Sequence, residues 1–195
     1  MQWTRAGAPV GAAADPGDGE LWGRAARGDQ GAFSELFERH AQAVWNHAYR
    51  LTGSWASAED LTSNTFLIAW RKRADITLVR DSALPWLYTV AGNLARTHHR
   101  GANRRLRLLR RIPEPPVVSD HADSVAGRLD GEARLRQVID AVRGLPKAQR
   151  QVVQLCLLGD LTIADAAALL EVAEVTVRSH LSRARAHLRA LLEEK

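Results

Sequence analysis

The chain has 195 residues, of which 46% are hydrophobic, with a formal net charge of +5 and a pI near 10.1. This length suits one or two small domains, and the basic charge favours a polyanionic partner such as nucleic acid. The single cysteine, Cys156, excludes an internal disulfide and a cysteine-rich zinc site. Because the sequence shows neither a signal peptide nor an apolar run of roughly 18–20 residues, we expect a cytoplasmic protein without membrane insertion.

Residues 1–19 are rich in Gly, Ala and Pro without periodicity, which predicts a disordered leader. A first helical domain is predicted over 20–105. Its first long helix starts near Phe33, where apolar residues begin to recur at helical spacing, and Gly53 is a plausible terminator. A second helix follows Ser57, a candidate cap, and its bulky apolar residues surround much of its circumference, which favours a central place in a bundle.

A third helix is predicted over 84–100, with Pro85 in its first turn. It combines cations, an amide, a hydroxyl and aromatic rings, a combination suited to single-stranded nucleic acid: cations hold phosphates, and an unstacked base can lie beside an Asn. The candidate contact residues are Trp86, Asn93, Arg96, Thr97 and Arg100. Alternatively, Trp86 and its neighbour Tyr88 are core or rim residues rather than stacking platforms.

Residues 106–131 are predicted to form a linker, because the basic run Arg104–Arg111 is followed by three prolines and a polar stretch. The linker can be a plain tether. Helical periodicity resumes in 132–195, where we predict a second domain of about four helices; one of them starts at Pro146 and ends at Gly159. No stretch alternates at period two for long enough to form a sheet, so the prediction is an all-α protein of two small helical domains.

The end of the second domain has the pattern of a helix-turn-helix. Thr162 and Asp165 have capping-box spacing at the start of its first helix. The second helix has one apolar stripe, from Val177 to Leu191, with cations and hydroxyls between the stripe residues. Such a helix can read the major groove, although a solvated amphipathic helix is the alternative. The candidate contact residues are Thr176, Arg178, Ser179, His180, Ser182, Arg183 and Arg185.

Two segments resemble one protein family. AEDLTSNTFLIAWR, followed by PWLYTVAGNLARTHHR, resembles the second conserved region of bacterial sigma-70-type initiation factors. LPKAQRQVVQLCLLGDLTIADAAALL, followed by VTVRSHLSRARAHLR, resembles their fourth region. With only these two regions and a short linker between them, the chain resembles an extracytoplasmic-function (group 4) sigma factor.

The resemblance implies a factor that directs core RNA polymerase to promoters, recognises −10 and −35 elements and helps to melt the DNA. Its partners would be the polymerase, through the β′ clamp helices and the β flap, promoter DNA and an anti-sigma factor. The segment 83–100 would capture the −10 single strand, with Asn93 beside a flipped base, and the helix from Val175 would read the −35 element. The basic linker would enter the polymerase. The candidate polymerase contacts are Glu59, Asp60, Leu61, Asn64 and Phe66, of which Phe66 is also a candidate structural residue.

The chain departs from the family pattern in three places. Ser63-Asn64 stands where the family usually has Gln-Glu, which predicts altered polymerase docking. Glu171, Ala173 and Val175 stand where the turn usually has Gly, Pro and Gly, which predicts a different turn geometry because glycine adopts positive φ without steric cost. His180 replaces a common Arg, which predicts one altered DNA contact.

The sequence leaves two alternative functions to compare with this one. A stand-alone dimeric helix-turn-helix regulator would need a sensor in the first domain, whose basic helix offers no evident ligand box. An enzyme would need a metal-ligand motif, a Gly-rich phosphate loop or a nucleophile elbow, and the sequence shows none of these. We therefore expect no catalytic residue, metal or cofactor.

Overall fold

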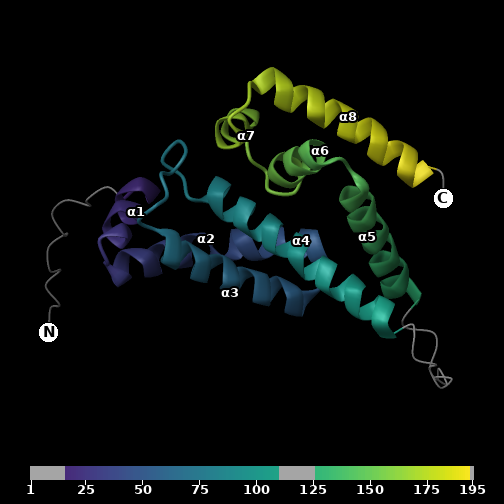
Figure 1. Ribbon diagram of the computed structural model, residues 1–195, viewed down its shortest axis with the longest axis horizontal. Helices are drawn as coiled ribbons and strands as arrows, with labels where there is room; N and C mark the ends of the chain where they lie inside the picture. The colour runs from purple at the N-terminus through teal and green to yellow at the C-terminus, as the bar shows by residue number, and fades with distance from the viewer. Residues whose placement is uncertain (1–15, 110–125, 194–195) are drawn as a thin grey trace, which may run out of the picture.

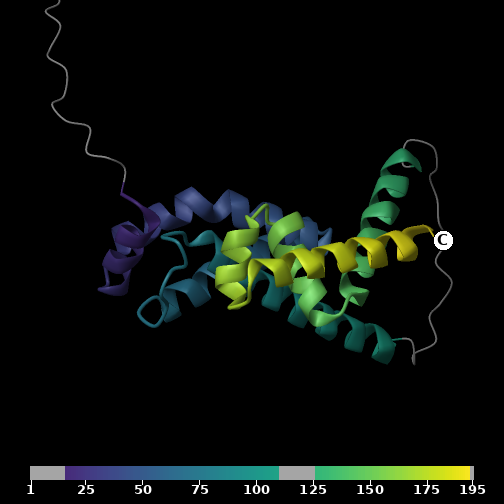
Figure 2. The same cartoon turned by 90° about the horizontal axis from the view of Figure 1, so that it is seen from above.

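The computed structural model describes residues 16–109 and 126–193, without the side chains of 99–133 and 192–193. Within these ranges the chain is helical, and its only strand-like feature is a single bridge between Val79 and Ser82. The predicted all-α class is confirmed. Figures 1 and 2 show the helices in two groups, α1–α4 and α5–α8, with α4 and the segment around α6 side by side.

The first group contains α1 (Asp18–Ala26), α2 (Gln30–Thr52), α3 (Trp55–Lys72) and α4 (Leu84–Leu109). Local chemistry sets the helix ends. The carboxylate of Asp29 accepts the Ala32 amide at the start of α2, and Gly53 ends α2 in the left-handed conformation, with φ of 66°. Helix α3 begins three residues before the predicted start, because Ser54 rather than Ser57 is its cap; the Ser54 hydroxyl accepts the Ser57 amide at 3.3 Å.

A buried carboxylate fastens α1 to the rest of the first group. Asp18 is 8% exposed and accepts the Ala83 amide at 2.9 Å, just before α4. Its oxygens also lie 2.7 Å from His40 Nε2 and 3.2 Å from Arg39 Nη1 on α2. Burial raises the pKa of Asp18, but its contacts with the Ala83 amide, His40 and Arg39 outweigh burial and lower the pKa below its usual value. One ionised group thus joins three segments.

The second group contains α5 (Ala126–Gly144), α6 (Lys147–Val152), the π-helical turn η1 (Val153–Leu157), α7 (Ile163–Leu170) and α8 (Glu174–Glu193). The helix predicted to run from Pro146 to Gly159 is therefore a short α-helix that widens into a π-helix. Helices α5, α6 and α7 all pack on α8. The apolar stripe of α8 faces them, with Val177 and Ala184 fully buried and Leu181 6% exposed.

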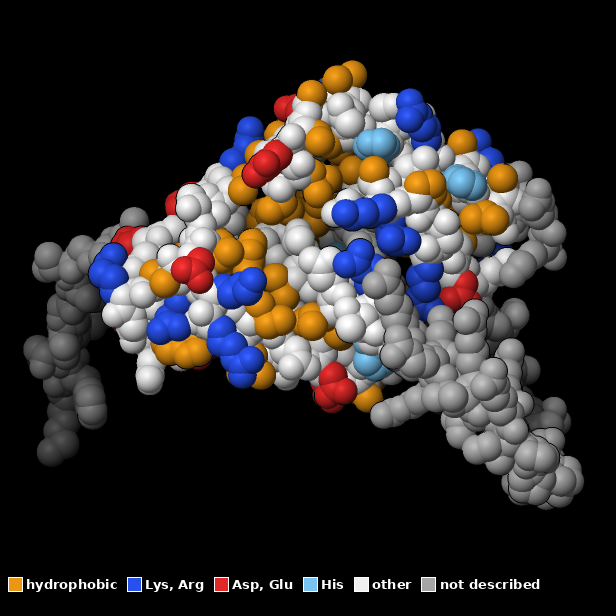
Figure 3. All heavy atoms as spheres, viewed as in Figure 1, with side chains coloured by type: hydrophobic (Ala, Val, Ile, Leu, Met, Phe, Trp, Pro, Cys, Tyr) orange, Lys and Arg blue, Asp and Glu red, His pale blue; other side chains and the backbone are white. Residues whose placement is uncertain are grey.

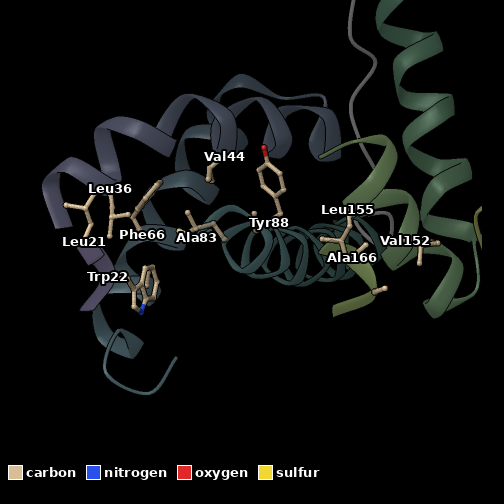
Figure 4. Close-up of a cluster of buried hydrophobic side chains, with 14 of the residues drawn as sticks. Leu21, Trp22, Leu36, Val44, Phe66, Ala83, Tyr88, Val152, Leu155 and Ala166 are labelled. Carbon is tan, nitrogen blue, oxygen red and sulfur yellow. The ribbon is translucent and has the colours of Figure 1, made fainter. Parts of the chain in front are cut away.

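The two groups share one hydrophobic core. Leu87, Tyr88 and Ala91 of α4 belong to the same buried cluster as Leu155 of η1 and Ala166 of α7. Figure 4 shows side chains of this cluster from Leu21 in α1 to Val152 and Ala166 in the second group.

Polar contacts join the groups at the edge of this core. Arg50 Nη1 donates to the Leu158 carbonyl at 2.7 Å and to Asp160 Oδ2 at 2.9 Å. Gly159 lies so close to the Tyr88 ring that a Cβ there would be 2.8 Å from a ring carbon. One face of α4 is therefore covered by the second group.

Candidate functional site

Helix α8 is positioned by the turn that precedes it. At the start of α7, the Thr162 hydroxyl accepts the Asp165 amide at 3.0 Å and donates to the Asp165 carboxylate at 2.6 Å, so Thr162 caps the helix as predicted. Helix α7 ends at Glu171, whose φ of 55° and ψ of 40° are left-handed. The predicted change of turn geometry is not seen at Glu171: it adopts the conformation that a glycine takes without steric cost, and the substitution adds strain instead.

The predicted contact residues of α8 fall into two groups. Arg178, Ser182, Arg183 and Arg185 are exposed, whereas Thr176, Ser179 and His180 are half-buried. The Nδ1 atom of His180 is buried and has no hydrogen-bond partner among the described residues. His180 therefore faces partly into the helix packing, and the exposed cations form the outer face.

A shallow groove of about 400 Å³ follows this outer face. It is lined by Ile163, Arg178, Leu181, Ser182, Arg185, Ala186 and Arg189. Sequence reasoning missed Arg189, although its spacing from Arg185 could have found it, because residues four apart share one helix face. Arg178 Nη2 is held 2.7 Å from Glu174 Oε2. The groove thus combines three guanidinium groups with a hydroxyl, and these are donors that suit base edges and phosphates.

A second hollow, also of about 400 Å³, lies between α3 and α4. It brings together three predicted residues, Trp86, Asn93 and Thr97, with Ile68, Lys72, Ile76, Thr89, Val90 and Leu94. Asn93 and Thr97 are exposed, and the Thr97 hydroxyl donates to the Asn93 carbonyl at 3.1 Å. Trp86 is half-buried and meets Trp22 edge to face, with ring centroids 5.7 Å apart. The hollow has an apolar floor and an amide at its rim.

The other two candidates of the third predicted helix lie apart from this hollow. Arg96 is exposed but lines a different cavity, between the two helix groups. The side chain of Arg100 lies outside the described residues. Sequence reasoning missed Lys72, which adds a cation to the hollow from the end of α3.

The five candidates on α3 also separate. Glu59, Asp60 and Asn64 are exposed. Leu61 and Phe66 are only 4% and 5% exposed and belong to the core. They can therefore position this face, but they contribute almost no surface to it. The Trp55 indole donates to Glu59 Oε1 at 2.9 Å, and the Asn64 amide donates to the Asp60 carbonyl at 2.8 Å. The exposed face formed by Glu59, Asp60 and Asn64 is therefore polar, and hydrogen bonds hold the side chains of Glu59 and Asn64 in place.

An aromatic groove of about 540 Å³ lies beside this polar face, and it was not predicted from the sequence. It is lined by Gln30, Phe33, Ser34, Phe37, Ser63, Phe66, Leu67 and Trp70. Phe37 is 43% exposed and Leu67 is 52% exposed, which is unusual for large apolar side chains clustered together. The atypical Ser63 lies at the edge of this groove. The combined surface has the composition of a protein-docking site.

The described residues show no features of a metal site or of a membrane-spanning helix. No group of three or more His, Cys, Asp and Glu there could hold a metal ion. In the same residues no helix is both long and apolar enough to cross a membrane.

Comparisons with known proteins account for both helix groups. Residues 36–105 match the family model "Sigma-70 region 2", and residues 135–188 match "Sigma-70, region 4". The ECF RNA polymerase sigma factor SigL of Mycobacterium tuberculosis is 33% identical over 170 residues, which cover 87% of this chain and 94% of that protein. The ECF RNA polymerase sigma factor BldN of Streptomyces coelicolor is 32% identical over 177 residues, which cover 90% of this chain and 66% of that protein.

Two solved structures resemble the fold. One is CnrH in complex with the cytosolic domain of CnrY, with a TM-score of 0.62 and 27% identity, covering 91% of this chain and 98% of CnrH. The other is the sigma factor RpoE of Bartonella quintana in complex with the anti-sigma factor NepR, with a TM-score of 0.53 and 25% identity, covering 83% of this chain and 96% of RpoE.

An all-α fold with a helix-turn-helix in its second helix group is typical of a DNA-binding transcription protein. The chain belongs to the sigma-70 family, as an ECF RNA polymerase sigma factor. It directs RNA polymerase to promoters, and the reading as a stand-alone dimeric regulator is not favoured.

Proposed function

We propose that the two DNA surfaces divide promoter recognition between them. The observation that carries the proposal is that Asn93, Thr97 and Trp86 line one hollow on α4, whereas Arg178, Ser182 and Arg185 line a groove on α8. The α8 groove reads the −35 element as double-stranded DNA. The α4 hollow holds an unstacked base of the −10 strand. Asn93 lies at the rim of the hollow, and Lys72 lies near the phosphate backbone of the strand. The boundaries 20–105 and 132–195 remain the proposed limits of the two domains.

The polymerase docks on the exposed face of α3. Glu59, Asp60 and Asn64 provide its polar part, and the neighbouring aromatic groove supplies apolar area through Phe37 and Leu67. Leu61 and Phe66 hold this surface from beneath. The β′ clamp helices are the proposed partner here, and the β flap is the proposed partner of the second group. The chain itself performs no catalysis and acts in the cytoplasm.

An anti-sigma factor is a further proposed partner. CnrH and RpoE were each solved in complex, CnrH with the cytosolic domain of CnrY and RpoE with the anti-sigma factor NepR, and both resemble this chain over most of its length. An inhibitor of this kind would cover one or more of the three surfaces described above.

Run-off transcription with purified core polymerase and a library of promoter fragments tests the proposal. Protein-dependent transcripts that share a two-part motif are expected.

Replacing both Arg178 and Arg183 with Ala should abolish selection of the upstream, −35 half of that motif while core binding persists. Each lost contact should cost about 1–3 kcal/mol of DNA-binding free energy. Asn93→Ala should slow open-complex formation more than closed-complex binding. Arg27→Ala, an exposed cation outside these surfaces, is the matched control.

Core binding is tested separately, by the affinity of each variant for the polymerase. Asp60→Arg and Leu67→Asp should both weaken it, while Glu38→Arg, on another exposed part of α2, should not. Transcription from the library without any shared motif, or full core affinity in both α3 variants, would contradict the assignment of these surfaces.

A further inference from the structure

A cavity between the two helix groups is separate from the α8 groove and from the aromatic groove, and it shares only Asn93 with the α4 hollow. It has a volume of about 250 Å³ and lies where α4 meets α5, α6 and η1. Its apolar wall includes Leu51, Val138, Ile139, Val142 and Leu158, and three amide side chains, Asn93, Gln151 and Gln154, also line it. Figure 3 shows Lys and Arg side chains gathered on the face between the two groups.

The charge of this cavity is of one sign. Five cations line it, Arg50, Arg96, Arg143, Lys147 and Arg150, and none of the described residues in the lining is acidic. Asp160 pairs with Arg50 and Asp140 pairs with Arg143, both from outside the lining. Two carboxylates therefore face five cations, which leaves a net positive site.

Several of these cations are held in place before any ligand binds. Arg150 Nη1 donates to the carbonyls of Arg143 and Leu145 at 2.9 and 3.1 Å. Arg50 donates to the Leu158 carbonyl at 2.7 Å. Fixed guanidinium groups lose little conformational freedom when an anion arrives, so such a site binds more tightly than flexible surface cations do.

The position of the cavity sets it apart from the groove assigned to the −35 element. Arg143, Lys147 and Arg150 lie on α5 and α6, which pack against α8, whereas the groove assigned to the −35 element lies on the outer face of α8. A duplex on that outer face does not explain why cations, amides and an apolar wall line one common cavity on the other side of α8.

We propose that this cavity binds a small organic phosphate, of mononucleotide or sugar-phosphate size. The cations and amides bind the phosphate oxygens, and the apolar wall takes the organic part. The volume lies just below the roughly 300–1,000 Å³ of typical small-molecule sites, which favours a compact ligand. Because the walls come from both groups, the bound phosphate holds the groups together. It also covers Arg96 and one side of Asn93, and it therefore opposes capture of the −10 strand, a consequence that rests on the proposed function.

Calorimetric titration of the full chain with AMP and with glucose 6-phosphate tests binding directly. At least one of them should bind in the micromolar range and at least tenfold more tightly than adenosine, pyrophosphate or sulfate at equal ionic strength. Lys147→Glu and Val138→Asp, one cation and one part of the apolar wall, should each weaken binding at least tenfold. Arg27→Glu, which removes an exposed cation elsewhere, should not; circular dichroism confirms that each variant is folded.

Three results would overturn the proposal: no binding by either phosphate ester at millimolar concentration, equal binding by sulfate or pyrophosphate, or unchanged binding in the folded Lys147→Glu variant. Run-off transcription then separates the site from its consequence. The ligand should inhibit the wild-type protein and leave Lys147→Glu active. Binding without any transcription by the ligand-free protein would reject the proposed function but not the site.

Discussion

Glu171 occupies a backbone conformation that disfavours every residue with a Cβ. It ends α7 with φ of 55°, so the turn before α8 carries strain of about 1–2 kcal/mol. Glu171→Gly should remove that strain. The greater freedom of glycine in the unfolded chain offsets part of the gain, and we expect the free energy of unfolding to rise by about 0.5–1 kcal/mol.

Urea unfolding followed by circular dichroism measures this change. Ala168→Gly is the matched control, because Ala168 is exposed within α7 and has ordinary helical geometry. There glycine should cost about 1 kcal/mol. If both substitutions destabilise the protein equally, the left-handed turn is not the conformation that the chain holds in solution.

At the scale of single elements, α2 carries a buried titratable group. His47 is 1% exposed and stacks on Tyr88 of α4, with ring centroids 4.4 Å apart. Burial, with a smaller contribution from the nearby Arg50, lowers its pKa to about 4, although the backbones of Leu158 and Tyr88 and the charge of Asp160 act in the opposite direction. The imidazole is therefore neutral in the folded protein at neutral pH.

This lowered pKa predicts a defined pH dependence. Between the unfolded value of about 6.5 and the folded value, the unfolded chain binds a proton that the folded chain does not, so stability falls as the pH falls through this window. Between pH 7.5 and 5.0 this group should remove about 2 kcal/mol from the free energy of unfolding. His47→Phe should flatten the dependence by that amount, and His187→Phe, at an exposed position on α8, should not. Equal slopes in all three proteins would contradict the neutral buried state.

Local chemistry made some element boundaries predictable. Gly53 and Thr162 act as predicted because a helix end needs only a permissive backbone or one nearby hydroxyl. The start of α3 was missed because Ser54 and Ser57 both satisfy the local rule, and the tertiary fold selects Ser54. The π-helical turn after Val152 was not predictable from periodicity, since α- and π-helical turns present similar apolar residues.

The candidate surfaces were predictable only where one helix carries them. The exposed arginines of α8 follow from its single apolar stripe. The aromatic groove requires α2 and α3 to be placed side by side, and the cavity with its five cations requires four separate segments. Leu61 and Phe66 match a family motif, but a motif does not say which of its members are buried; burial is a property of the packed bundle.

For the whole molecule, the decisive feature is that α4 serves both helix groups. Its Leu87, Tyr88 and Ala91 join the shared core, while Asn93 lies next to the covered face and lines both the α4 hollow and the cavity between the groups. A polymerase-bound factor that captures a −10 strand on α4 must give that strand room. We therefore expect the second group to move away from α4 during initiation.

Gly92 allows this expectation to be tested. It is buried on α4, and a Cβ there would lie 3.3 Å from Gln154 Oε1, the end of a flexible side chain. Gly92→Ala should therefore keep the groups together and add helix stability of up to about 1 kcal/mol. Gly92→Trp cannot fit against η1 and should separate them, which small-angle scattering would record as a larger radius of gyration. An unchanged radius for Gly92→Trp would mean that the packing between α4 and η1 adjusts locally without separating the groups. If the radius does increase, the separated variant should initiate transcription at least as fast as the wild type, because α4 is already uncovered for the −10 strand.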